Sequence, residues 1–131
     1  MTDEITTGQA SDQVLVFVYG RMKQGGANHG VLAQSKFIGG AVTAPLYTLV
    51  DLGGLPGLKK DGQRAIRGEL YAVDAQTLAN IDELEDHPDT FRRDTLTLED
   101  GREVVGYVLP ASQAAGFPHM NEVVWGEVLA S

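Results

Sequence analysis

An apolar run that ends in a glycine constrains the fold of this chain more than any other segment. Residues 14–18 read VLVFV and are followed by Tyr19 and Gly20. Uninterrupted apolar residues, most of them β-branched, predict a strand that is buried on both faces. Gly20 lets the backbone turn at the end of that strand and lets another molecule approach the main chain closely. Because the amides of such a loop can converge on an anion, the loop after the strand is a candidate binding site.

The charge balance narrows the classes of partner. The chain has 131 residues, with ten Lys and Arg against eighteen Asp and Glu, and its net charge is −8. This acidic balance argues against nucleic acids and anionic membranes as main partners and favours a small molecule or a positively charged one. The longest apolar stretch is too short to span a bilayer. Zero cysteines exclude disulfides, thiolate metal sites and cysteine nucleophiles, and fit a cytoplasmic location.

The remaining pattern predicts one domain of the α+β class. Residues 1–12 are polar and are expected to form a flexible tail, and residues 13–131 a single domain. Asp-Gly pairs predict two tight hairpins, at Asp61-Gly62 between residues 55–60 and 64–73, and at Asp100-Gly101 between 95–98 and 103–109. Strands dominate, so we expect a mostly antiparallel sheet that curls toward a barrel. Strands are predicted near 14–19, 36–43, 46–51, 64–73, 91–99 and 103–109.

Two short helices are predicted beside these strands. Residues 27–34 favour a short helix, and residues 74–85 favour a longer one whose first turn Asp74 can cap. His87-Pro88 is expected to end the second helix, because a residue before proline avoids the helical region. Residues 123–128 fit a strand and a short helix equally well.

One carboxylate of the second helix falls on the apolar side. At about 100° per residue, Glu85 lies about 20° from Leu78, on the side that faces the interior. A buried carboxyl group has a raised pKa and accepts protons well near neutral pH. Glu85 is therefore a candidate general base; the alternatives are a solvated acid at the helix end or an ion pair with Arg92 or Arg93. Asp82 is a second candidate, better suited to accepting a hydrogen bond from a loop amide.

The sequence lacks the common motifs for metal binding, nucleotide binding and serine-hydrolase catalysis. The three histidines have no metal-ligand spacing, so no metal site is expected. The glycine-rich segments match neither a P-loop nor a dinucleotide fingerprint, and no Gly-x-Ser-x-Gly elbow occurs. Tyr19 fits either the core or the lip of a site, and Tyr71 and Tyr107 fit packing positions whose hydroxyls reach for a partner.

Three segments, taken together and in order, resemble the AIG2-like gamma-glutamylcyclotransferase family. They are VFVYGRMKQGGANHGVL (Val16–Leu32), RGELYAVD (Arg67–Asp74) and IDELEDHPDTFRR (Ile81–Arg93). The likeness spans about residues 14–110. It implies a small β-barrel with a few helices and a cavity beside the first strand. It also implies an enzyme that cyclises a γ-glutamyl group to 5-oxoproline, releases an amine or peptide, and needs no cofactor.

The resemblance assigns roles to particular residues. The family's catalytic glutamate falls on Glu85. Its substrate-holding loop falls on Tyr19, Gly20, Arg21 and Met22. This chain departs from the family at three positions: Arg21 replaces a usually small or hydroxyl residue, Met22 replaces a residue that is often Leu, and Phe91 replaces the usual Tyr. We also expect Phe91 to contact the substrate.

These departures keep other readings open. One is a carboxylate-assisted amidase that uses water in place of the internal amine and so releases free glutamate. Another is a non-catalytic module that binds a small amine or a partner protein on the same scaffold. A structural role with an empty barrel is the third. Neither the released group nor the oligomeric state follows from the sequence.

Overall fold

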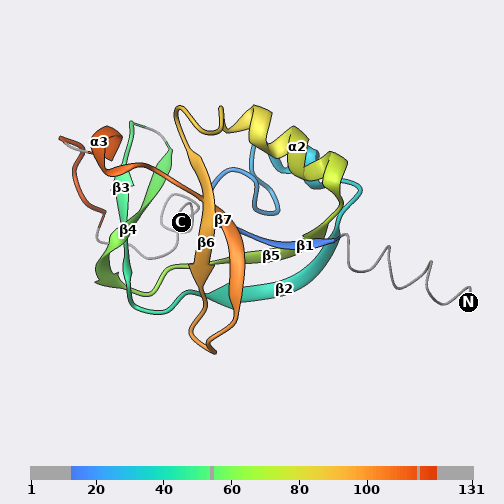
Figure 1. Ribbon diagram of the computed structural model, residues 1–131, viewed down its shortest axis with the longest axis horizontal. Helices are drawn as coiled ribbons and strands as arrows, with labels where there is room; N and C mark the ends of the chain where they lie inside the picture. The colour runs from blue at the N-terminus through green and yellow to red at the C-terminus, as the bar shows by residue number, and fades with distance from the viewer. Residues whose placement is uncertain (1–12, 54, 115, 121–131) are drawn as a thin grey trace, which may run out of the picture.

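The computed structural model describes residues 13–53, 55–114 and 116–120, and shows an α+β fold (Figure 1). The predicted tail at residues 1–12 and the undecided segment at 123–128 lie outside the described residues. The described elements follow the order β1 (Val14–Val18), η1 (His29–Leu32), β2 (Lys36–Val42), β3 (Tyr47–Asp51), β4 (Pro56–Arg64), β5 (Arg67–Val73), α2 (Ala75–Leu84), β6 (Arg92–Thr97), β7 (Glu103–Val108) and α3 (Ala111–Ala114).

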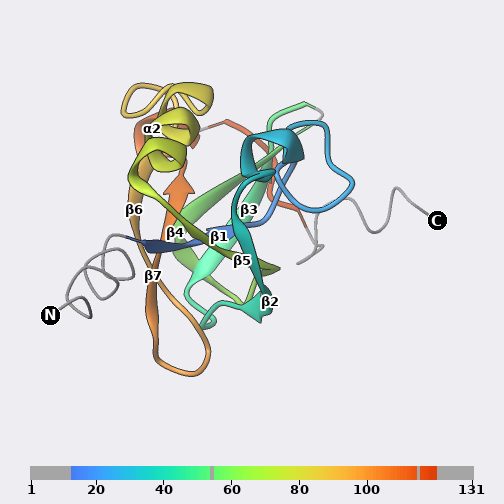
Figure 2. The ribbon, with the colours of Figure 1, turned by 90° about the vertical axis from the view of Figure 1, so that its right-hand side faces the viewer.

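The apolar first strand lies at the centre of the larger sheet. That sheet has the strand order β2-β5-β1-β7-β6, and β3 pairs with β4 in a second sheet. β1 pairs antiparallel with β5 and parallel with β7, and the other described strand pairs are antiparallel. In Figures 1 and 2, the β6–β7 hairpin projects at the end of the molecule opposite α2. The predicted mixed class, with strands dominant and helices few, is confirmed.

Both faces of β1 are covered, as its sequence predicts. Val16 and Val18 point into a cluster that includes Ile81 of α2. Phe17 and Tyr19 point into a second cluster that includes Leu49 and Leu58 of the smaller sheet. All seven of these side chains are buried. The strand is therefore fixed from two sides, and the loop that leaves it starts from a rigid position.

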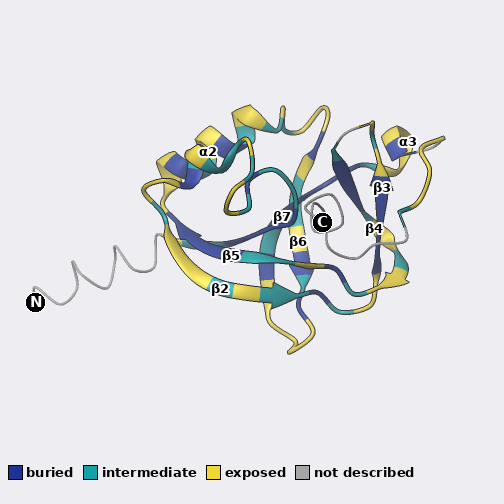
Figure 3. Ribbon diagram, turned by 180° about the vertical axis from the view of Figure 1, so that it is seen from behind, coloured by how far each residue is buried: buried dark blue, intermediate teal, exposed yellow. Residues whose placement is uncertain are grey.

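The larger sheet curls until its outer strands meet at one end. Thr43, just after β2, forms an isolated bridge with Leu98, just after β6. The Ala44 N–H donates to the Thr97 carbonyl and the Glu99 N–H to the Val42 carbonyl, both at 2.9 Å. Apart from this bridge, the edge strands β2 and β6 are not paired with each other in the described part of the chain, so the expected closed barrel is not confirmed. The rest of β2 is mostly exposed (Figure 3).

One predicted hairpin is wrong and the other is confirmed. Residues 61–62 make no turn; they lie in a bulge of β4, where the Thr48 hydroxyl donates to the Asp61 carbonyl at 2.8 Å. A Cβ on Gly62 would overlap the Tyr47 carbonyl, so this glycine permits close approach instead of a turn. At the second site, Gly101 has φ +91° and the Leu98 N–H donates to the Arg102 carbonyl at 2.8 Å. This closes a three-residue loop, one residue longer than predicted.

The helices agree with the prediction in place and differ in extent. Asp74 caps α2 by accepting from the Thr77 N–H at 2.8 Å, as expected. The helix ends at Leu84, ahead of the predicted stop at His87-Pro88, and Asp86 adopts φ 57°. In the segment 27–34, only His29–Leu32 form a helical turn, and it is a 3-10 turn. The short α3 was not predicted. Among the described residues, no helix has the length and apolar character needed to cross a membrane.

Candidate active site

A cavity of about 200 Å³ opens between the loop after β1 and the end of α2. Its inner wall comes from β1 and β7, through Val18 and Tyr107, and its rim from the segments around residues 55–56 and 84–91. All six residues proposed from the sequence for catalysis or substrate binding line this one cavity: Tyr19, Gly20, Arg21, Met22, Glu85 and Phe91.

Glu85 is held at the C-terminal end of α2. Its N–H donates to the Ile81 carbonyl at 2.9 Å, and Ile81 is fully buried. The side chain is half-buried in the cavity. Burial raises the pKa of the Glu85 carboxyl from 4.5 to about 7, although the nearby Arg21 guanidinium acts in the opposite direction. Near neutral pH this carboxyl group can therefore both accept and return a proton.

The loop after β1 is shaped by its main chain. The Lys23 N–H donates to the Gly20 carbonyl at 3.1 Å, and the Asn28 N–H donates to the Arg21 carbonyl at 2.9 Å. A Cβ added to Gly20 would lie 3.1 Å from Pro56 Cγ, and one added to Gly26 would overlap the Arg21 carbonyl. Gly20 therefore allows the loop to pack closely on Pro56, and Gly26 allows it to close on the main chain of Arg21.

Tyr19 anchors the cavity wall through its hydroxyl. This hydroxyl donates to the Tyr107 carbonyl at 2.9 Å and accepts from the Leu58 N–H at 3.1 Å. Burial and the charge of Glu85 raise its pKa. Tyr19 thus joins β1 to β7 and β4 while lining the cavity.

Met22 and Phe91 give the cavity its apolar character. Both side chains are buried and belong to the core cluster that contains Ile81. The Phe91 N–H also donates to the Glu85 carbonyl at 3.3 Å, which ties the segment after α2 back to the helix end. Because Phe91 has no hydroxyl, its side chain packs against the cavity without offering a hydrogen bond.

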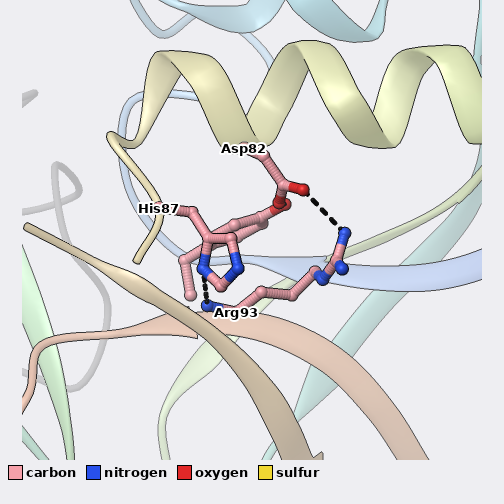
Figure 4. A network of polar contacts seen from close by, with 4 residues as sticks. Asp82, His87 and Arg93 are labelled. Atoms are coloured by element: carbon pink, nitrogen blue, oxygen red, sulfur yellow. Dashed lines mark hydrogen bonds and ion pairs between the residues drawn. The ribbon is translucent and has the colours of Figure 1, made fainter. Parts of the chain in front are cut away.

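Asp82, His87 and Arg93 belong to a polar network that the sequence did not predict (Figure 4). Asp82 accepts from Arg93 Nη1 at 2.8 Å and from the Tyr107 hydroxyl at 2.6 Å. The Arg93 N–H in turn donates to His87 Nδ1 at 3.0 Å. Asp82 was expected to accept from a loop amide; its side chain takes two side-chain donors instead, while its carbonyl accepts the His87 N–H at 2.9 Å.

The ion pair of Arg93 bears on one alternative for Glu85, namely that Glu85 pairs with Arg92 or Arg93. Arg93 forms its ion pair with Asp82, and Glu85 forms none within 4 Å in the described part of the chain. The three-residue spacing of Asp82 and Glu85 places both on one side of α2, and this was a signal available in the sequence. The involvement of Tyr107 was not, because it depends on the position of β7.

The arrangement suits proton transfer in a partly dry pocket. One carboxyl group has a pKa near neutrality, one cation lies close to it, and two tyrosines, Tyr19 and Tyr107, are among the lining residues. Among residues 13–53, 55–114 and 116–120, no three His, Asp or Glu side chains gather in a way that could hold a metal ion.

Comparison with known proteins gives consistent matches. The family model described as "Gamma-glutamyl cyclotransferase, AIG2-like" matches residues 16–128. A Vibrio cholerae protein named "Putative gamma-glutamylcyclotransferase" is 49% identical over 84 residues, which cover 64% of this chain and 72% of that protein. The bovine "Gamma-glutamylaminecyclotransferase" is 40% identical over 90 residues, covering 62% of this chain and 54% of the relative. A mouse AIG2-like crystal structure superposes with a TM-score of 0.69 at 27% identity, covering 82% of this chain and 86% of that one.

Proposed function

Because the chain belongs to the AIG2-like gamma-glutamyl cyclotransferase family and is an enzyme, we propose that it cyclises a γ-glutamyl group to 5-oxoproline and releases an amine or peptide. The observation that carries this proposal is the Glu85 carboxyl, which lies in a cavity beside Gly20 and has a pKa raised to about 7. A base of this pKa is about half ionised at neutral pH, where a general base is most effective.

Glu85 moves the proton in the proposed reaction. The substrate's α-amine arrives as an ammonium, which cannot attack. Glu85 takes one proton from it, the amine nitrogen attacks the γ-carbonyl carbon, and the five-membered ring closes. The ring nitrogen then loses its second proton, the C–N bond to the leaving group breaks, and the leaving nitrogen takes up both protons, one of them from Glu85, to depart as an ammonium. One well-placed acid–base group contributes about 10²–10⁴-fold to the rate, and the intramolecular attack supplies much of the rest.

The loop after β1 holds the substrate in this proposal. Main-chain N–H groups of Gly20, Arg21 and Met22 bind the substrate carboxylate or the developing oxyanion. The Arg21 guanidinium adds a charged contact to a carboxylate. The ring of Tyr19 and the side chains of Met22 and Phe91 exclude water from the aliphatic part of the glutamyl group. Since the nucleophile and the base are both supplied, the reaction requires no cofactor, and we expect it to take place in the cytoplasm.

Product analysis tests this proposal. The purified protein is incubated with a panel of γ-glutamyl compounds, such as γ-glutamyl-ethylamide, γ-glutamylglycine and γ-glutamyl-ε-lysine, and the products are identified by mass spectrometry. Release of 5-oxoproline supports the proposal. Release of free glutamate would show that water is the nucleophile, and binding of the panel without turnover would favour a non-catalytic module. Either result would overturn the proposed reaction.

A further inference from the structure

We propose that Tyr107 is a further catalytic residue, whose hydroxyl oxygen accepts a hydrogen bond from the attacking α-amine, and that Asp82 is the positioning residue that keeps this oxygen an acceptor. This inference rests on the proposed cyclisation and deepens it. It assigns a second group to the same cavity, with a task different from that of Glu85.

The hydroxyl of Tyr107 is already committed as a donor. Tyr107 lies on β7 and lines the cavity, and its hydroxyl donates to Asp82 Oδ1 at 2.6 Å. A phenol has one proton to donate, and its oxygen can also accept. With the proton directed at Asp82, only the accepting lone pairs of the oxygen remain for a ligand. An amine or ammonium nitrogen, which carries N–H donors, is the ligand group that matches this arrangement.

Asp82 is itself fixed from the opposite side. Its second oxygen, Oδ2, accepts from Arg93 Nη1 at 2.8 Å, and its carbonyl accepts the His87 N–H at 2.9 Å. The Arg93 N–H is in turn held by His87 Nδ1 (Figure 4). Each oxygen of the Asp82 carboxylate thus has its own side-chain donor, and a carboxylate can only accept hydrogen bonds. The direction of the Tyr107 proton is therefore set by the network.

The raised pKa of Tyr107 gives it a role different from that of Glu85. Burial, then the hydrogen bond and charge of Asp82, and finally the charge of Glu85 raise the pKa of Tyr107, against the opposing charge of Arg93. Tyr107 therefore stays a neutral phenol and does not act as the base. Glu85 and Tyr107 line the same cavity, so one amine bound there can meet both groups. Glu85 removes the proton, while Tyr107 directs the nitrogen lone pair toward the carbonyl carbon.

The hydrogen bond between Tyr71 and Glu69 serves as a control for the one between Tyr107 and Asp82. The Tyr71 hydroxyl donates to Glu69 Oε1 at 2.9 Å, and Tyr71 is 2% exposed, as is Tyr107. Tyr71 does not line the cavity, so its hydroxyl has the same kind of partner without access to a substrate. Loss of the Tyr71 hydroxyl reports the structural cost of deleting such a bond and nothing of catalysis.

The test compares Tyr107→Phe with Tyr71→Phe in the steady-state release of 5-oxoproline from γ-glutamyl-ethylamide. A lost hydrogen bond to a charged or developing charged group predicts a fall in kcat of about 10- to 100-fold for Tyr107→Phe. The change in KM should be much smaller. Tyr71→Phe should keep the wild-type kcat. Glutaric acid monoethylamide, which lacks the α-amine, should inhibit wild type and Tyr107→Phe equally, since it has no N–H to offer at that point.

Asp82→Asn tests the direction of the proton. The side-chain amide of the new residue can donate to the Tyr107 oxygen. The phenol proton then points into the cavity, where it meets the N–H donors of the substrate amine, so that the oxygen no longer accepts from them. We expect kcat to fall as in Tyr107→Phe, and the double variant to fall no further than Tyr107→Phe alone. The Tm of each variant is measured alongside, so that loss of folding is separated from loss of rate.

The possible outcomes separate this inference from the proposed function. If wild type releases 5-oxoproline and folded Tyr107→Phe has an unchanged kcat, the inference is overturned and the proposed function stands. Additive losses in the Asp82→Asn, Tyr107→Phe double variant would also overturn it, because the two groups would then act independently. If wild type releases no 5-oxoproline from the panel, the proposed function fails and this inference fails with it.

Discussion

Glu85→Gln should make the protein more stable at alkaline pH and leave its stability unchanged at acidic pH. The pKa of the Glu85 carboxyl is about 7 in the folded protein and 4.5 when unperturbed, because burial disfavours the charge. The folded state therefore holds this proton more tightly than the unfolded state does. The resulting contribution to stability is fully present below pH 4.5 and is lost as the pH rises through 7.

The magnitude follows from the two pKa values. Each pKa unit corresponds to about 1.36 kcal/mol, so the full shift would cost about 3 kcal/mol once Glu85 is ionised. Glu85 is half-buried and keeps contact with water, which lowers this value. We expect Glu85→Gln, which has the same shape without the charge, to raise the free energy of unfolding by roughly 1–3 kcal/mol at pH 8.5. At pH 4.5 or below the change should approach zero.

The assay is urea unfolding of wild type, Glu85→Gln and Glu83→Gln at both pH values. Glu83 lies on the same helix and is exposed, so its substitution should change stability by less than about 0.5 kcal/mol at either pH. A gain for Glu85→Gln that is equal at pH 4.5 and pH 8.5 would refute the reasoning, since the cost of burying the charge would then be absent. A loss of stability at pH 8.5 would refute it more strongly.

Three further substitutions test the surroundings of the carboxyl group. Arg21→Met removes the cation that lowers the pKa of Glu85, so the acidic limb of the pH profile of kcat/KM should move to higher pH; an unmoved limb would show that Arg21 does not act on Glu85. Gly26→Ala would force a Cβ onto the Arg21 carbonyl, so we expect a loss of about 1–3 kcal/mol in urea unfolding and a raised KM, whereas wild-type values would contradict the close packing of the loop. Ile81→Ala empties a fully buried position under α2 and should lower the free energy of unfolding by about 2–5 kcal/mol, while a loss below 1 kcal/mol would contradict the role of Ile81 as the anchor of the helix.

The sequence predicts well what depends on local pattern. The run at 14–18 required cover on both faces, and β1 lies between two apolar clusters. The period of the helix placed Glu85 near the apolar side, and the structure brings it to the cavity even though α2 ends one residue earlier. Asp74 was recognised as a cap because capping needs only residues close in sequence.

The sequence predicts poorly what depends on distant partners. Asp61-Gly62 resembles a hairpin turn, but pairing of β4 with β3 favours a bulge there, and the partner strand is not visible in the dipeptide. Tyr107 was predicted to pack in the core with its hydroxyl reaching for a partner, which is confirmed, but the partner Asp82 lies 25 residues away and could not be named. The isolated bridge between Thr43 and Leu98 likewise depends on how far the whole sheet curls.

Release of 5-oxoproline by Glu85→Gln, measured beside wild type with γ-glutamyl-ethylamide at pH 8, tests the role of this carboxyl group most directly. Binding of glutaric acid monoethylamide to both proteins shows that the cavity is intact in the variant. Our account predicts that the variant keeps this binding and loses at least about 100-fold in kcat. A folded variant that releases 5-oxoproline at close to the wild-type rate would show that Glu85 does not move the proton.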